Sequence, residues 1–198
     1  PAVPGAARRS LGSAMVAHQL WTGPGVDVLG SVSPDGRYLS FVDWSTGALA
    51  VRDLTTGQNR RLTKKGSWSE SNEFALFSAI SPDGTQVAYA WFNKEQFWEL
   101  RLLPMIGGPD SSKPRVLFRN KEVWQVGLPV WFPDGKEILV VFSKNPALDE
   151  IGIVSVSDGS VKVLKSLRGR SPWPTGISPD GRYIVYSALA QENSPGLP

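Results

Sequence analysis

Ser33-Pro34-Asp35-Gly36 is the first of four closely related tetrapeptides in this chain of 198 residues. The others are Ser81-Pro82-Asp83-Gly84, Phe132-Pro133-Asp134-Gly135 and Ser178-Pro179-Asp180-Gly181. Their prolines are 48, 51 and 46 residues apart. A fixed turn that recurs at about 40–50 residues is typical of the blades of a β-propeller. The repeat therefore predicts an all-β architecture.

Each tetrapeptide has the chemistry of a hairpin turn. Proline presets φ at the first central position, Asp bonds to the local backbone, and Gly adopts the left-handed conformation that closes the turn. An apolar strand follows each glycine, for example 38–42 and 138–142. Two further strands follow in the first three repeats. Together with the strand that precedes the turn, they are expected to form a four-stranded antiparallel blade in each of these three repeats.

The repeats divide the chain into expected segments. Residues 1–26 form an irregular lead with a short strand near 19–21, and residues 188–198 form an irregular tail. The blades are expected at 27–63, 77–119, 125–166 and, in part, 172–187. Because a closed propeller has about 4–8 blades, this count of three and a half favours a fragment of a longer protein. The alternative is an open arc of blades with exposed edges and apolar faces.

The stretches SPDGRYLSFVDWSTGALAVRDLTTGQNRRLT (33–63) and SPDGRYIVYSA (178–188) resemble the TolB-like β-propeller repeat, a WD-like repeat built around a Pro-Asp-Gly turn. The resemblance covers about 27–187. It implies a six-bladed propeller in the complete protein, found either in periplasmic interaction proteins or before the hydrolase domain of prolyl-oligopeptidase-like enzymes. It favours a periplasmic or extracytoplasmic location, which the residues themselves do not fix.

Composition narrows the classes of partner. A formal charge of +3 with scattered basic residues does not form the basic stripe of a nucleic-acid reader. No apolar run reaches the roughly 18 residues of a membrane helix. The absence of Cys excludes disulfides and thiolate sites. The expected partner is a protein or peptide, and the isolated chain is expected to self-associate through its exposed blade faces.

No catalytic, metal or cofactor constellation is apparent in the sequence. His18 is the only histidine and lies outside the repeats, and the stretch 66–70 lacks the spacing of a nucleophile elbow. The acids at Asp35, Asp83, Asp134 and Asp180 are explained as turn formers rather than Ca²⁺ ligands. The paired acids Asp149-Glu150 have the chemistry for acid–base work, but they precede a strand at a loop exit and are interpreted as part of a solvated loop.

The connections of a four-stranded meander separate onto two ends. The Pro-Asp-Gly turns share one end with short glycine turns, whereas the long segments gather at the other end: 43–47, 64–77, 91–98, 120–127, 143–150 and 166–175. Six of the eight tryptophans fall in or beside these long segments, and Trp is enriched at binding hot spots. The candidate partner contacts are Trp44, Trp68, Trp91, Trp98, Trp124 and Trp173. The alternative is that these rings pack over the open ends of the blades.

Three hypotheses on function follow. The first is a non-catalytic scaffold that binds a protein or peptide through the long-loop end. The second is the substrate-gating propeller of a serine peptidase whose hydrolase domain lies outside this chain. The third is a sensor domain of a signalling protein.

Overall fold

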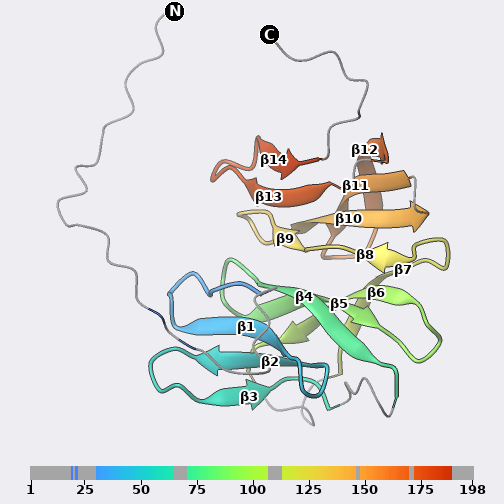
Figure 1. Cartoon of the computed structure of the whole chain (residues 1–198). Coiled ribbons are helices and arrows are strands. Elements are labelled where there is room, and N and C mark those ends of the chain that lie inside the picture. Colours follow the sequence, from blue (N-terminus) through green and yellow to red (C-terminus); the bar gives the residue numbers. More distant parts are fainter. Residues whose placement is uncertain are drawn as a thin grey trace, which may run out of the picture.

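The fold was obtained as a computed structural model that describes residues 19, 21, 30–64, 71–106, 113–145, 148–169 and 172–188. Within these ranges the chain contains strands and turns and no helix, so none that could cross a membrane. In the described part of the chain the strands form four antiparallel sheets, which succeed one another along the chain and lie stacked from bottom to top in Figure 1. The all-β, blade-like architecture predicted from the repeat is thus confirmed.

The second blade shows the repeat in its complete form. Its strands are β4 (Phe74–Ile80), β5 (Gln86–Phe92), β6 (Trp98–Pro104) and β7 (Arg115–Arg119). They pair in the order β4-β5-β6-β7, and every pair is antiparallel. β4 is the innermost strand of the blade and β7 the outermost.

The other blades vary this plan. The first contains β1 (Tyr38–Asp43), β2 (Ala48–Asp53) and β3 (Asn59–Arg61), and among the described residues a bridge between Val32 and Leu39 pairs with β1 on its inner side. In the third, the inner strand is split into β8 (Gln125–Val126) and β9 (Val130–Trp131). Both pieces pair with β10 (Glu137–Asn145), which is followed by β11 (Leu148–Ser155) and β12 (Val161–Arg168). The fourth sheet contains β13 (Trp173–Ile177) and β14 (Ile184–Ser187).

The Pro-Asp-Gly segments are hairpin turns that satisfy their own polar groups. In the second blade, Gly84 has φ of 71° and its N–H donates to the Ser81 carbonyl at 2.9 Å. The Ser81 hydroxyl donates to the Asp83 carboxylate at 2.5 Å, and the Thr85 N–H donates to the same oxygen at 3.0 Å. The carboxylate is thereby committed to the turn.

Such bonds lower the pKa values of Asp35, Asp83 and Asp180. The hydroxyl of Ser81, followed by the Thr85 N–H, lowers the pKa of Asp83 below its ordinary value. Serine hydroxyls have the same leading effect on the pKa values of Asp35 and Asp180. A carboxylate whose charged form is stabilised by local donors is explained by the turn itself, which supports the structural interpretation of these acids.

Hydrophobic side chains form the contacts between successive blades. One cluster joins the first and second blades around Leu49, Val87 and Leu103. A second joins the second and third blades and includes Leu100, Ile138 and Phe142. The third joins β10 and β11 to the β13–β14 sheet, with Leu139 and Ile151 at its centre. The strands are apolar on both faces because blades pack on either side of them.

Several expected boundaries shift. The second blade begins at Phe74 rather than at 77, because a β-bulge at Phe77 interrupts the two-residue period of β4 and obscures the strand in the sequence. β10 ends only at Asn145, and β11 already begins at Leu148. Most of the loop expected at 143–150 therefore belongs to the two strands of a hairpin. Gln19 and Trp21 are not in a strand, and most of the expected lead and all of 189–198 lie outside the described residues.

Candidate functional site

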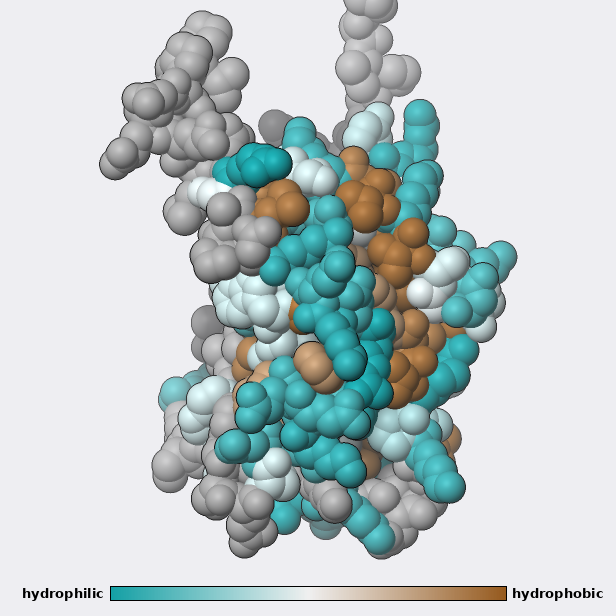
Figure 2. All heavy atoms as spheres, turned by 90° about the vertical axis from the view of Figure 1, so that its right-hand side faces the viewer, coloured by the Kyte–Doolittle hydropathy of each residue, from teal (hydrophilic) through white to brown (hydrophobic). Residues whose placement is uncertain are grey.

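The two ends of the blades carry different connections between strands. We call the end that carries the 43–47, 93–97 and 120–124 connections and the β10–β11 hairpin the long-loop face; it lies at the right of Figure 1. The Pro-Asp-Gly turns lie at the opposite end. Figure 2 looks onto the long-loop face, where hydrophilic atoms cover the centre and hydrophobic atoms form a band to the right of them.

Three of the candidate tryptophans are half-exposed near this face. Trp44 follows β1, Trp124 precedes β8 and Trp173 begins β13. Their exposed fractions are 47%, 52% and 49%. These indole rings are accessible to a partner, and large exposed aromatic side chains are the usual anchors of interfaces.

Trp91 and Trp98 are not available as partner contacts, and this part of the prediction is wrong. Both side chains are buried, and they lie within β5 and β6 rather than in the connection between them. Trp98 packs edge-to-face against Phe74, with ring centroids 5.6 Å apart. Trp91 belongs to the cluster between the first two blades. Trp68 lies outside the described residues.

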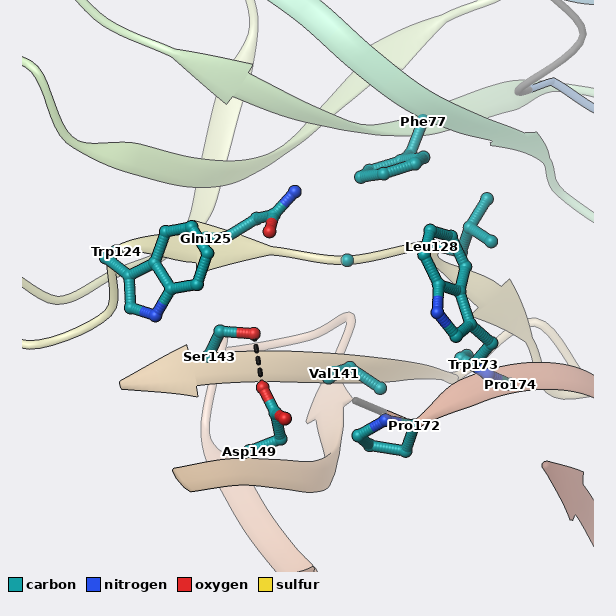
Figure 3. Close-up of a pocket in the computed structure, with 11 residues that line it drawn as sticks. Phe77, Trp124, Gln125, Leu128, Val141, Ser143, Asp149, Pro172, Trp173 and Pro174 are labelled. Carbon is teal, nitrogen blue, oxygen red and sulfur yellow. Dashed lines mark hydrogen bonds between the residues drawn. The ribbon is translucent and has the colours of Figure 1, made fainter. Parts of the chain in front are cut away.

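A pocket of about 140 Å³ opens between Trp124 and Trp173. It receives side chains from the second blade, the third blade and the start of β13, so that three successive repeats contribute to it. Figure 3 shows Trp124 on one side and Trp173 on the other, with Phe77 above and Asp149 below. The rest of its lining consists of Gln125, Gly127, Leu128, Val141, Ser143, Pro172 and Pro174.

The β-bulge in β4 places Phe77 in this pocket. The register of β4 against β5 shifts between Leu76 and Ser78, and Phe77 has φ of 48°. A bulky residue rarely adopts this left-handed conformation, and bulges often redirect a side chain beside a functional site. The Phe77 ring meets Trp173 edge-to-face at 6.1 Å between centroids. The residue with the strained backbone in the second blade, Phe77, thus forms part of the wall of the pocket.

The floor of the pocket is polar. Ser143 and Asp149 face each other in the β10–β11 ladder, and the Ser143 hydroxyl donates to the Asp149 carboxylate at 2.5 Å. Asp149 is only 8% exposed. The interpretation of Asp149 as a solvated loop residue is therefore wrong. Asp149 lies within β11, because the hairpin is longer than expected, and residues 172–174 at the start of the next blade line the pocket beside it.

Charged side chains on the long-loop face pair with one another. Lys144 forms an ion pair with Glu150 at 2.9 Å, Arg119 contacts Glu95, and Lys121 lies over the Phe97 ring at 5.3 Å. Within the described ranges, no group of three or more metal-ligating side chains converges. The described polar groups of the pocket include the carboxylate of Asp149, the hydroxyl of Ser143 and the amide of Gln125.

The long segments 64–77, 120–127 and 143–150 include Phe77, Gln125 and Asp149, but the sequence does not single these residues out as site residues. The bulge that redirects Phe77 has no glycine to mark it, and Asp149 belongs to an acidic pair of the kind that is usually exposed. Only the inter-blade packing brings them together with the two tryptophans.

Comparisons with known proteins agree with the architecture. No family model matches the chain. A curated TolB homolog from Chlorobium chlorochromatii is 39% identical over 79 residues, which are 36% of this chain and 18% of that protein. The solved structure of a putative TolB from Agrobacterium tumefaciens superposes with a TM-score of 0.62 and 24% identity, over 84% of this chain and 55% of that one. A Mycobacterium tuberculosis puromycin-hydrolyzing peptidase superposes with a TM-score of 0.57 and 18% identity, over 73% of this chain and 23% of that one. The chain thus spans about half, or less, of each of these proteins.

Proposed function

We propose that this chain, a segment of a TolB-like β-propeller, is a non-catalytic scaffold that binds a protein or peptide partner through its long-loop face. The observation that carries the proposal is the pocket between Trp124 and Trp173. Two half-exposed indole rings border a concave site with a small number of polar groups. Such a combination is typical of binding sites, and binding residues are commonly held in loops on a rigid scaffold.

The chemistry of the pocket supports binding rather than catalysis. A serine nucleophile needs a base that accepts its proton and a third group that orients the base. Ser143 is hydrogen-bonded to a carboxylate, and the only histidine of the chain, His18, lies outside the described residues. Ser143 and Asp149 are also held inside a regular strand ladder. This arrangement favours a fixed recognition surface.

The second candidate is the substrate-gating propeller of a serine peptidase. Its support is the likeness to the puromycin-hydrolyzing peptidase, which at 18% identity concerns the fold alone. The gene sequence beyond residue 198 separates the two: a Gly-x-Ser-x-Gly elbow followed by Asp and His favours the peptidase, whereas further blades favour the scaffold. An added DNA-binding or membrane segment favours the sensor.

Truncating the pocket tryptophans tests the binding role. We expect Trp124→Ala and Trp173→Ala each to weaken binding of a peptide selected from a random phage-displayed library at least about tenfold, which corresponds to about 1.4 kcal/mol. Isothermal titration calorimetry measures the loss. The reason is that each substitution removes one wall of the pocket.

Trp44→Ala is the matched control, because Trp44 is similarly exposed on the long-loop face but does not line the pocket. It is expected to change the affinity less than twofold. An equal loss in all three variants, or a loss of folded structure in the two pocket variants alone, contradicts the assignment of the pocket as the binding site.

A further inference from the structure

We propose that the pocket between Trp124 and Trp173 receives a basic side chain of the partner, a Lys ammonium or an Arg guanidinium, whose positive charge meets Asp149. This inference rests on the proposed binding function and specifies the chemistry of the partner. Three properties of the pocket support it: a buried carboxylate, two indole walls, and an apolar lining for the stem of a long side chain.

The buried carboxylate of Asp149 has no counter-charge among the described residues. Burial of an ionised carboxylate is unfavourable unless other groups pair with it. Asp149 accepts one hydrogen bond from the neutral Ser143 hydroxyl, whereas its neighbour Glu150 pairs with Lys144 at 2.9 Å. Among the described residues no cation is paired with Asp149. A carboxylate can accept several hydrogen bonds, so a donor from a partner has acceptor sites to occupy.

The indole walls favour the same ligand. A Lys or Arg cation is attracted to the face of an aromatic ring, and Trp is the most effective ring for this interaction. Trp124 and Trp173 lie on opposite sides of the pocket with Asp149 below them (Figure 3). A cation that enters between the rings therefore approaches the carboxylate.

The second blade already contains this combination within the chain. The Arg101 guanidinium lies over the Trp91 ring, 5.0 Å from its centroid, and forms an ion pair with Glu99 at 2.5 Å. Glu99 is buried. There, an indole ring and a buried carboxylate hold an internal arginine. The pocket likewise contains indole rings, those of Trp124 and Trp173, and a buried carboxylate, that of Asp149, around a space that a cation can enter.

The size and lining of the pocket suit a long basic side chain. Its volume of about 140 Å³ is about ten times the space needed for one water molecule. Leu128, Pro172 and Pro174 can contact the methylene stem, as apolar surfaces commonly do for Lys and Arg. A neutral apolar side chain fits this lining too, but it leaves the buried carboxylate without a counter-charge. A phosphate group is repelled by the same carboxylate.

The test uses Nα-acetyl-arginine amide and Nα-acetyl-lysine amide as probes, with Nα-acetyl-norleucine amide as the uncharged control. The indole N–H signals of Trp124 and Trp173 in the NMR spectrum of the 198-residue chain report binding, assigned through Trp124→Phe and Trp173→Phe. We expect both signals to shift saturably with the basic probes, and the norleucine probe to bind at least tenfold more weakly.

Asp149→Asn is expected to weaken binding of the basic probes at least tenfold. Asparagine retains the shape of Asp149 and can still accept the Ser143 hydrogen bond, but it lacks the charge. Glu150→Gln is the matched control, because it removes an equal charge from the adjacent residue, which does not line the pocket. Its effect is expected to be less than twofold.

The inference is overturned if the norleucine probe binds as well as the basic probes, or if Glu150→Gln weakens binding as much as Asp149→Asn. If Asp149→Asn does not fold, the comparison of probes on the unaltered chain decides. Selected library peptides that bind through Trp124 without a basic residue overturn the cation site and leave the proposed function standing. Basic probes that bind while no library peptide depends on Trp124 overturn the peptide partner and leave the cation site.

Discussion

Replacement of Phe142 by Ala is expected to lower the free energy of unfolding by about 3–5 kcal/mol. Phe142 is only 2% exposed and lies between the second and third blades, where its ring centroid is 4.4 Å from that of Phe118. A Cβ atom at Gly152 would lie 2.9 Å from the Phe142 ring, so the ring fills the space that the glycine provides. Its removal leaves a cavity between two rigid sheets, which cannot close readily.

Chemical denaturation followed by tryptophan fluorescence measures this loss. Tyr183→Ala is the control, because it removes another aromatic ring from a residue that is 64% exposed. A surface substitution of this kind is expected to change stability by about 0.5 kcal/mol or less. Similar losses in the two variants would contradict the packing of the second blade on the third through Phe142.

Gly159→Ala is expected to produce the second large loss. Gly159 has φ of 74°, and a Cβ atom built on it would lie 2.1 Å from the backbone oxygen of Leu117 in β7. The left-handed conformation costs a non-glycine residue about 1–2 kcal/mol. The clash adds about 1–3 kcal/mol, since β7 has to shift to relieve it. The turn after β11 therefore docks on the outer strand of the preceding blade only as glycine.

Gly84→Ala separates the two contributions. Gly84 has φ of 71°, and no atom lies within 4 Å of the Cβ position. This variant is expected to lose only the conformational part, about 1–2 kcal/mol. Equal thermal or denaturant midpoints for the two variants would show that Gly159 makes no close contact with the second blade.

The turns and strands of this fold follow from local chemistry, and for that reason the sequence predicts them well. Pro-Asp-Gly specifies a turn through φ preferences and hydrogen bonds that lie within five residues, as the bonds among Ser81, Asp83 and Thr85 show. The apolar strand after each turn is equally local in origin. Four-stranded blades therefore could be predicted without knowledge of how the blades pack.

The candidate site depends on contacts between blades, which local sequence does not specify. Trp124 and Trp173 are half-exposed, whereas Trp91 and Trp98, which flank the β5–β6 connection, are buried. Their local sequences do not distinguish these outcomes, because the burial of a Trp at a strand end depends on the neighbouring blade. Trp98 belongs to the cluster that joins the second and third blades, and Phe74 and Phe92 of its own blade pack against the same ring.

Asp149 shows the same limit more sharply. An acidic pair near a hairpin is normally solvated, and nothing local marks one of its members as buried. Pairing of Asp149 with Ser143 across the ladder, and the start of β13 beside it, place the carboxylate at the base of the pocket. The sequence thus draws attention to Asp149 as one of an acidic pair, but it does not predict that the carboxylate is buried.

Hydrogen–deuterium exchange with and without a selected peptide tests most directly that the long-loop face is the binding face. Binding at the pocket is expected to slow exchange in 122–128, in 141–145 and at Trp173, and to leave the turns at 33–36, 81–84, 132–135 and 178–181 unchanged. Protection centred on these turns, with no change around Trp124 and Trp173, would contradict the account.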